Sequence, residues 1–279
     1  MTETKTNWIS PSEFDGFPPE RTPDSHKGTY GHLLVVAGSK GFHGAGVLTA
    51  HAAQRAQPGL VTLLTQEDIY YPVAAQLQSA MVGVWAPDIH QFDKAGAMLF
   101  GPGLAAPNLP DEVRIIFRRL WREAAAPMVV DASAIAWLVP HSFGKNIIRV
   151  LTPHPGEAAA LLKQTVAQVQ ANREQALREI SRRYGNCWVV LKGHHTLVGR
   201  SEGEIWVNRT GNAHLAQGGS GDVLSGFIAG LLAQPALQAD SGRTIRYAVW
   251  QHGAAADQLQ AGRKNWVVEE LVKELGNAR

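Results

Sequence analysis

The sequence predicts an α/β protein with a central, mostly parallel sheet that is flanked by helices on both faces. Two observations support this prediction. Short apolar runs alternate along the chain with longer segments of helical spacing, a pattern typical of parallel sheets covered by helices. The unusual glycine, proline and acid clusters follow the apolar runs, at the carboxyl ends of strands, where such sheets bind ligands.

Each apolar run is interpreted as one strand, beginning at His32. The expected strands lie within 32–38, 60–65, 97–103, 127–133, 149–157 and 186–193, followed by a hairpin from TLVG (196–199) and EIWVN (204–208). Helical spacing predicts helices at 46–57, 69–77, 111–123, 166–184, 218–234, 241–260 and 267–275. A further helix begins near Glu157.

The domain organisation expected from these elements is simple. Residues 1–27 are polar and contain four prolines, so they predict an irregular or partly helical arm. No repeat, low-complexity tract or strong linker divides the remainder. Residues 28–279 are therefore expected to form a single catalytic domain.

Composition argues against several classes of partner. The chain has 26 Lys plus Arg against 24 Asp plus Glu, a net charge of +2 and no block of like charges, so a nucleic-acid partner is not expected. The longest nearly apolar run, 223–233, has 11 residues and is too short to cross a membrane. The polar N-terminus resembles no signal peptide, and we expect a cytoplasmic protein. Cys187, alone in an apolar run, is interpreted as a core residue.

The segment GGSGD, Gly218 to Asp222, is the most informative. Three glycines let successive N–H groups point into one small space, and the apolar run that follows predicts a helix whose positive end faces the same space. The combination is typical of a site for a phosphoryl group. A structural glycine turn, with Asp222 as an ordinary first-turn acid, is the competing interpretation.

Two other loops carry candidate ligand contacts. TPHPGE, Thr152 to Glu157, holds His154 between two prolines, and KGHHT, Lys192 to Thr196, offers a cation, a glycine and a hydroxyl to a nucleotide. An ordinary turn with a surface histidine is an alternative for the first loop. A zinc site at the adjacent His194 and His195 is not expected, because no HExxH or CxxC pattern accompanies them.

Other nucleotide-binding patterns are absent or weak. GSKGFHGAG, 38–46, follows the first strand but is not GxGxxG, and no GxxxxGK[ST] occurs, which disfavours a Rossmann fingerprint and a P-loop. GPGL, 101–104, is interpreted as backbone that lines the same crevice.

Several segments of the chain together resemble the ADP-dependent NAD(P)H-hydrate dehydratase family, which is part of the ribokinase-like superfamily. In order, these segments are SHKGTYGHLLVVAGS, GPGL, VVDASA, LTPHPGE, VVLKGHHTLV and GNAHLAQGGSGDVLSG. The resemblance covers about residues 20–275, and HKG, TPHPGE and GGSGD in this order are its specific motifs. It implies a ribokinase-like fold and a repair reaction. Water is removed from the S epimer of hydrated NADH or NADPH through phosphorylation of the C6 hydroxyl by ADP, leaving AMP and phosphate.

The resemblance also implies roles for individual residues. Asp222 would be the general base and contact the substrate. The anion hole would comprise Gly219, Ser220 and Gly221. The nucleotide site would comprise Lys192, Gly193, His194, His195, Thr196 and Gly221. Besides Asp222, the substrate site would include Ala45, Gly103 and His154. Mg²⁺ is the expected cofactor, with ligands that the sequence does not identify. A homotetramer and a separately encoded epimerase are further expectations.

The chain departs from the family pattern at a few positions. Ser133 stands where the family has a second acid, Leu215 replaces a frequent methionine, and His194 and His195 occupy positions where the family usually has small residues.

Two other functions stay open at this point. A ribokinase-like kinase for a vitamin precursor or sugar alcohol would leave a stable phosphorylated product, and a catalytically silent protein would only bind a nucleotide.

Overall fold

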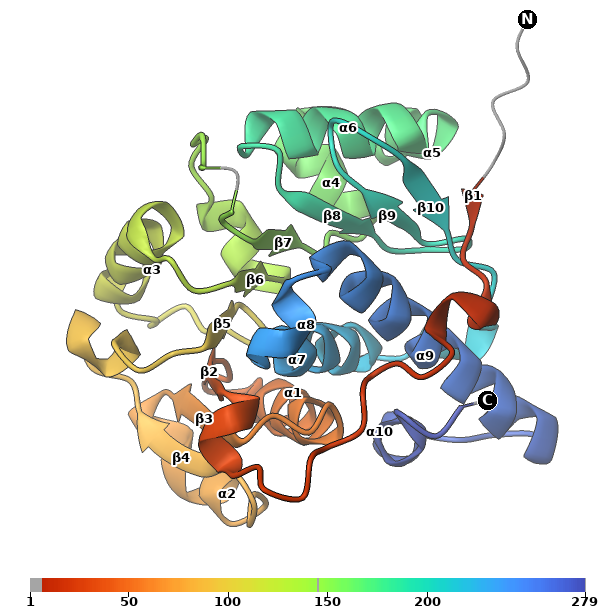
Figure 1. Ribbon diagram of the computed structural model, residues 1–279. Coiled ribbons are helices and arrows are strands. Elements are labelled where there is room, and N and C mark those ends of the chain that lie inside the picture. Colours follow the sequence, from red (N-terminus) through yellow and green to blue (C-terminus); the bar gives the residue numbers. More distant parts are fainter. Residues whose placement is uncertain (1–6, 145, 279) are drawn as a thin grey trace, which may run out of the picture.

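The computed structural model describes residues 7–144 and 146–278. Within these ranges, ten strands form one sheet in the order β1-β10-β9-β8-β7-β6-β5-β2-β3-β4. Only β9 runs antiparallel to its neighbours, so the predicted mostly parallel sheet is confirmed (Figure 1). The strands are β1 (Asn7–Trp8), β2 (His32–Val36), β3 (Leu60–Thr65), β4 (Met81–Val84), β5 (Ala97–Phe100), β6 (Met128–Val130), β7 (Arg149–Leu151), β8 (Trp188–Leu191), β9 (Leu197–Gly199) and β10 (Ile205–Val207).

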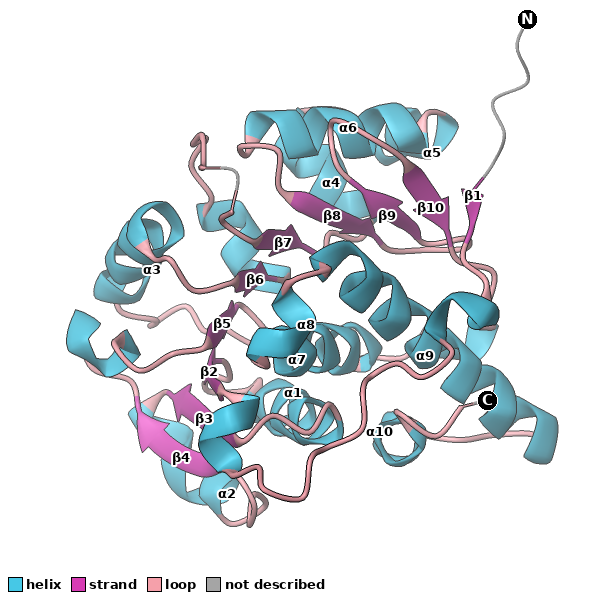
Figure 2. Cartoon of the chain, viewed as in Figure 1, coloured by secondary structure: helices cyan, strands magenta, loops and turns pink. Residues whose placement is uncertain are grey.

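Helices cover both faces of the sheet, as predicted (Figure 2). Each face has its own apolar core. One face carries α1 (His43–Arg55), α2 (Tyr70–Ala74), α7 (Ser220–Leu232), α8 (Pro235–Gln238), α9 (Ser241–Gly262) and α10 (Val268–Glu274). The other carries α3 (Asp111–Glu123), α4 (Pro155–Leu162), α5 (Val166–Ala171) and α6 (Arg173–Arg183). Cys187 is buried in the second core, where burial raises the pKa of its thiol.

The elements differ from the sequence prediction at strands β1 and β4, at helix α8 and over 166–184. Strand β1, which has two residues, strand β4, which has two exposed ends, and the four-residue helix α8 were not predicted. The single helix predicted over 166–184 is wrong: it is two helices, broken at Asn172 with φ −139° and ψ 57°. Asparagine is a poor helix former, and its side chain competes for backbone hydrogen bonds.

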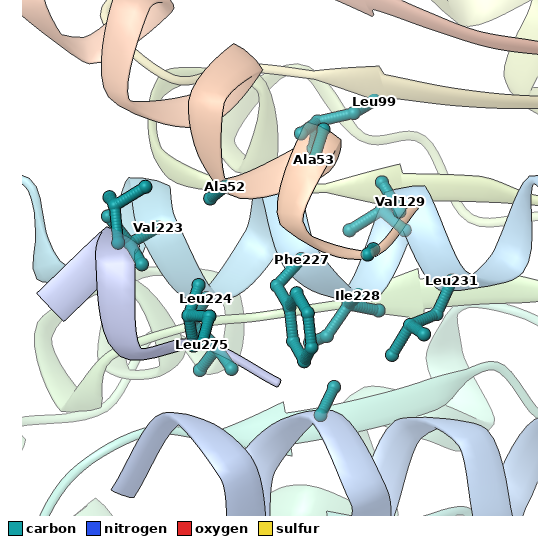
Figure 3. Close-up of a cluster of buried hydrophobic side chains, with 14 of the residues drawn as sticks. Ala52, Ala53, Leu99, Val129, Val223, Leu224, Phe227, Ile228, Leu231 and Leu275 are labelled. Atoms are coloured by element: carbon teal, nitrogen blue, oxygen red, sulfur yellow. The ribbon is translucent and has the colours of Figure 1, made fainter. Parts of the chain in front are cut away.

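Helix α7 crosses α1 at very close range, and this contact fixes the position of its N-terminus (Figure 3). A Cβ at Gly226 would lie 2.4 Å from the Thr49 carbonyl oxygen, and one at Gly230 would lie 2.6 Å from that of Ala53. Phe227 and Ile228 are almost wholly buried beside them. The apolar run 223–233 therefore serves packing. Within the described ranges, no helix has the length and apolar character needed to cross a membrane.

The described part of the N-terminal arm is tied to the domain. Strand β1 pairs in parallel with β10, and the short 3₁₀ helix Pro11–Phe14 lies against α9. Arg243 donates two hydrogen bonds to the Glu13 carbonyl oxygen, and Arg246 pairs with the Glu13 carboxylate at 3.0 Å. The Phe14 ring packs on Trp250 at 5.3 Å. The described part of the segment 1–27 thus contains a short 3₁₀ helix, while residues 1–6 lie outside the described part.

Candidate active site

The candidate site lies at the carboxyl edge of the sheet, where the loops after several parallel strands meet the N-terminus of α7. Strand β2 has β3 on one side and β5 on the other. The chain continues from β2 to β3 and β4 on one side and then returns to β5 on the other, so the strand order reverses at this point. The loops after β2 and β5 touch, since the Gly38 amide donates to the Pro102 carbonyl at 2.8 Å. Such a switch in strand order is where α/β sheets form binding crevices.

The glycine loop before α7 has the conformation that its sequence predicts. Gly219 adopts φ 94°, a left-handed conformation that favours glycine, and a Cβ there would lie 2.5 Å from Leu48 Cδ1. Helix α7 begins at Ser220. The first N–H groups of a helix have no partner within the helix, so the amides of Gly219 and Gly221 are suited to hold an anion. The Ser220 amide, also predicted for the anion hole, donates to the Gln217 carbonyl oxygen at 3.3 Å.

Lys192 carries the positive charge of the site to this loop. Its ammonium donates to Asp131 Oδ1 at 2.8 Å, and Asp131 is only 1 % exposed. A Cβ added at Gly221 would lie 3.2 Å from Lys192 Nζ, so the ammonium rests against the loop where glycine leaves room. Burial opposes the charge, but the carboxylates of Asp131 and Glu157 outweigh it and raise the pKa of Lys192.

Asp222 lies in the first turn of α7, within electrostatic range of these groups. Burial, followed by repulsion from Asp131, raises the pKa of Asp222 to about 7, while Lys192 acts in the opposite direction. Burial likewise raises the pKa of Glu157. The carboxyl groups of Asp131, Glu157 and Asp222 thus all interact electrostatically with the Lys192 ammonium. A carboxyl group with a pKa near the working pH is well matched to accept a proton in a reaction.

A cavity of about 620 Å³ opens beside the glycine loop. All six residues predicted to bind the nucleotide, Lys192 to Thr196 and Gly221, line it together with Ser220. Its remaining wall comes from 208–213, from Leu215, Ala216 and Leu224, and from α9 through Val249, His252 and Gly253. The cavity joins a cation and a glycine loop to apolar surface, which suits a nucleotide with its phosphates at Lys192.

Two residues that the sequence analysis missed hold the walls of this cavity. His252, buried in α9, has Nε2 2.9 Å from the Ser220 carbonyl oxygen, and burial lowers its pKa to about 4. The neutral ring therefore donates to the glycine loop. Asp257 accepts hydrogen bonds from the Gly211 amide at 2.8 Å and from Asn212 Nδ2 at 3.0 Å. A histidine or an acid in a helical segment gives no sequence signal for such a role.

The residues predicted to bind the substrate lie beside the loops after β2, β5 and β7. A Cβ at Gly103, which has φ 65°, would lie 2.8 Å from the Cβ of Ala45, so these two positions are neighbours. His154 caps α4: its Nδ1 accepts from the Gly156 and Glu157 amides at 3.0 and 3.3 Å. Its backbone N–H donates to Glu157 Oε2 at 2.8 Å. These hydrogen bonds hold the imidazole at the start of the helix. The sequence predicted that the two flanking prolines alone would hold it.

The donor set for a metal ion is sparse. In the part of the chain that the structure describes, no three His, Cys, Asp or Glu side chains gather in a way that could hold a metal. Asp131 Oδ2 is nonetheless buried and has no hydrogen-bond partner among the described residues. One free carboxylate oxygen fits an ion that takes most of its ligands from phosphates and water, as Mg²⁺ commonly does.

Comparison with protein families gives a match over most of the chain. The family model described as NAD(P)H-hydrate dehydratase matches residues 33–276. The ADP-dependent (S)-NAD(P)H-hydrate dehydratase of Neisseria meningitidis serogroup B is 42% identical over 248 residues, covering 86% of this chain and 81% of that protein. Bifunctional NAD(P)H-hydrate repair enzymes also match, and this chain spans about half of their length.

Solved structures give the same result for the fold. The ADP/ATP-dependent NAD(P)H-hydrate dehydratase of Bacillus subtilis, co-crystallized with ATP and Mg²⁺, superposes with a TM-score of 0.84 at 28% identity, over 99% of this chain and 98% of that one. A ribokinase-like superfamily protein of Enterococcus faecalis gives a TM-score of 0.81 at 25% identity, over 98% and 94%. The predicted ribokinase-like fold is thereby confirmed.

Proposed function

The chain belongs to the NAD(P)H-hydrate dehydratase family, and from this premise we propose that it dehydrates the S epimer of hydrated NADH and NADPH with ADP as phosphoryl donor. The observation that carries the proposal is the meeting of Lys192, Asp222 and the glycine loop beside one nucleotide-sized cavity. Residues 28–279 would act as the catalytic domain. The reaction would give NADH or NADPH, AMP and phosphate.

The first chemical step falls to Asp222. The C6 hydroxyl of the hydrated ring is a weak nucleophile until its proton is removed, and Asp222 would accept that proton. The oxygen then attacks the β-phosphorus of ADP, and the bond from that phosphorus to the bridging oxygen breaks, leaving AMP. The raised pKa of Asp222, about 7, makes the carboxylate a stronger base than an ordinary aspartate.

The glycine loop and Lys192 would stabilise the phosphoryl group during transfer. The amides of Gly219 and Gly221 face charge that spreads over the transferred oxygens, and preorganised donors of this kind lower the barrier. Lys192, fixed by Asp131, adds a positive charge at the same place. Phosphate then leaves from C6 with loss of a ring proton, which restores the ring double bond.

Mg²⁺ is the ion that this chemistry calls for, because it neutralises the nucleotide phosphates. Phosphate oxygens and water would supply most of its ligands, and Asp131 Oδ2 is a buried carboxylate oxygen that has no hydrogen-bond partner among the described residues. Ala45, Gly103 and His154 would orient the hydrated dinucleotide across from the ADP cavity. A homotetramer, a cytoplasmic location and a separately encoded epimerase remain part of the proposal.

The decisive experiment mixes the protein with hydrated NADH, Mg²⁺ and either ADP or ATP. We expect the absorbance of reduced nicotinamide to return, AMP and phosphate to appear in equal amounts, and ADP to support faster turnover than ATP. A stable phosphorylated product would instead favour a small-molecule kinase. Binding of ADP without any turnover would favour a silent nucleotide-binding protein.

A further inference from the structure

Strand β1 brings an N-terminal aromatic residue next to the nucleotide cavity. Trp8 pairs with Val207 in the parallel β1–β10 ladder, and the Ile9 amide donates to the Val207 carbonyl at 2.9 Å. The chain that follows β10 directly forms the cavity wall from Asn208 to Ala213. Trp8 is half-buried and does not itself line the cavity, so any effect that it has on a bound nucleotide must pass through a neighbour.

Arg209 is that neighbour. Its guanidinium carbon lies 3.6 Å from the centroid of the Trp8 ring, the geometry of a close cation–π contact. Arg209 lines the cavity and is exposed. Among the described residues it has no carboxylate within ion-pair distance, unlike Lys192. The indole therefore covers one face of the Arg209 guanidinium. No carboxylate among the described residues neutralises the charge of this guanidinium.

The surrounding rings reinforce this placement. The Trp8 ring meets His195 edge-on, at 5.5 Å and 80°, and His195 stacks on His194 at 3.9 Å. Desolvation, together with the charges of His194 and Arg209, lowers the pKa of His195. Arg209 therefore carries its positive charge at the cavity wall, next to the His195 imidazole.

We propose that Trp8 is a positioning residue, whose ring holds Arg209 flat at the cavity wall so that its guanidinium contacts the phosphates of a bound nucleoside diphosphate. The inference rests on the proposed nucleotide site. It gives the N-terminal strand a part in nucleotide affinity. It also explains a contact that core packing does not require, since Arg209 remains exposed.

A double-mutant cycle with direct binding tests this proposal. Calorimetry would measure ADP and uncharged adenosine on the full chain and on Trp8→Ala, Trp8→Phe, Arg209→Met and the Trp8→Ala/Arg209→Met pair. We expect Arg209→Met to weaken ADP by about tenfold and Trp8→Ala by about fivefold. Trp8→Phe should stay within about twofold of the natural protein, because it keeps a ring. The pair should be no weaker than Arg209→Met alone, and adenosine affinity should not change.

Trp206→Ala is the matched control. It removes the Trp206 indole of strand β10, which does not line the cavity. The guanidinium carbon of Arg246 lies 4.2 Å from the centroid of this ring. This variant should lower the melting temperature without changing ADP affinity. Additive losses in the cycle, an equal loss for adenosine, or normal ADP binding by Trp8→Ala would overturn the role of Trp8. An unsubstituted protein that binds no ADP would instead overturn the proposed function, and this inference with it.

Discussion

The two halves of helix α7 use glycine for opposite purposes. At the N-terminus, Gly219 allows a left-handed turn against the Leu48 side chain, and Gly221 leaves space for the Lys192 ammonium. Further along, Gly226 and Gly230 leave space for the backbone of α1, which comes too close for any side chain. The first half collects charge, including a buried carboxyl group with a pKa of about 7, while the second half is wholly apolar and buried.

This difference separates residues that act from residues that hold the acting ones in place. A buried carboxyl group whose pKa is raised costs stability once it ionises, so Asp222 is poorly explained as a structural residue. The close α1–α7 contact, in contrast, contributes packing energy and fixes where the positive end of the helix points. Substitutions in the first half should therefore change activity, and substitutions in the second half should change stability.

The largest effect is expected from Asp222→Asn. Asparagine keeps the size of the side chain but cannot accept the proton of the C6 hydroxyl, so kcat should fall by at least about 100-fold. ADP affinity should be kept or slightly increased, because a negative charge beside the phosphates is lost. Turnover assays and calorimetry on this variant test both statements. A kcat near that of the natural protein would remove Asp222 from the mechanism.

The same variant has a predicted effect on stability that depends on pH. The pKa of Asp222 is about 7 in the fold against an ordinary value of 3.8, so the fold favours the protonated form, and its contribution is lost as the pH rises through about 7. Asparagine avoids this loss. The variant should melt higher than the natural protein above pH 7, and the two should converge below the ordinary value. A lower melting temperature throughout would contradict the predicted burial cost.

Gly226→Ala tests the second half of α7. The new methyl would lie 2.4 Å from the Thr49 carbonyl oxygen, so the helices must separate. We expect a loss of about 1–3 kcal/mol in the free energy of unfolding, with kcat of the folded protein changed little. Gly262→Ala is the matched control, because a Cβ there meets nothing within 4 Å. Equal stability of the two variants in denaturant titrations would contradict the packing role.

The smallest effect is expected at His154, where structural and binding roles overlap. His154→Ala should raise KM for the hydrated dinucleotide by about three- to tenfold, with a smaller change in kcat. It should also lower the melting temperature, because the helix cap of α4 is lost. His154→Asn can still cap the helix, so it should raise KM without that loss. A fall in kcat at unchanged KM would give His154 a chemical role.

The fold could be predicted largely because the signals for its elements are local. Strands β2, β3 and β5 to β10 are short apolar runs, and the predicted helix 111–123 agrees with α3. Strand β4 lies in the apolar run 80–86, a signal like that of the predicted strands, although its end residues Met81 and Val84 are exposed in the fold. The break at Asn172 depends on one backbone conformation, which helical spacing does not encode.

The candidate site could be predicted only where its residues lie within motifs. Lys192 and the glycine loop belong to such segments, and they meet across the sheet edge as expected. Asp131 lay in a recognised segment, but its ion pair with Lys192 spans 61 positions in the chain, so spacing could not reveal it. His252 and Trp8 reach the cavity only through tertiary contacts, from helix α9 and from strand β1.

The pH dependence of kcat tests most directly whether the first turn of α7 carries the chemistry. Because Asp222 must be ionised to accept the proton, kcat of the natural protein should rise with pH through a midpoint of about 7. The residual activity of Asp222→Asn should lack this rise. A kcat that stays flat across that midpoint in the natural protein, or a rise that persists unchanged in the variant, would contradict the assignment of Asp222 as the base.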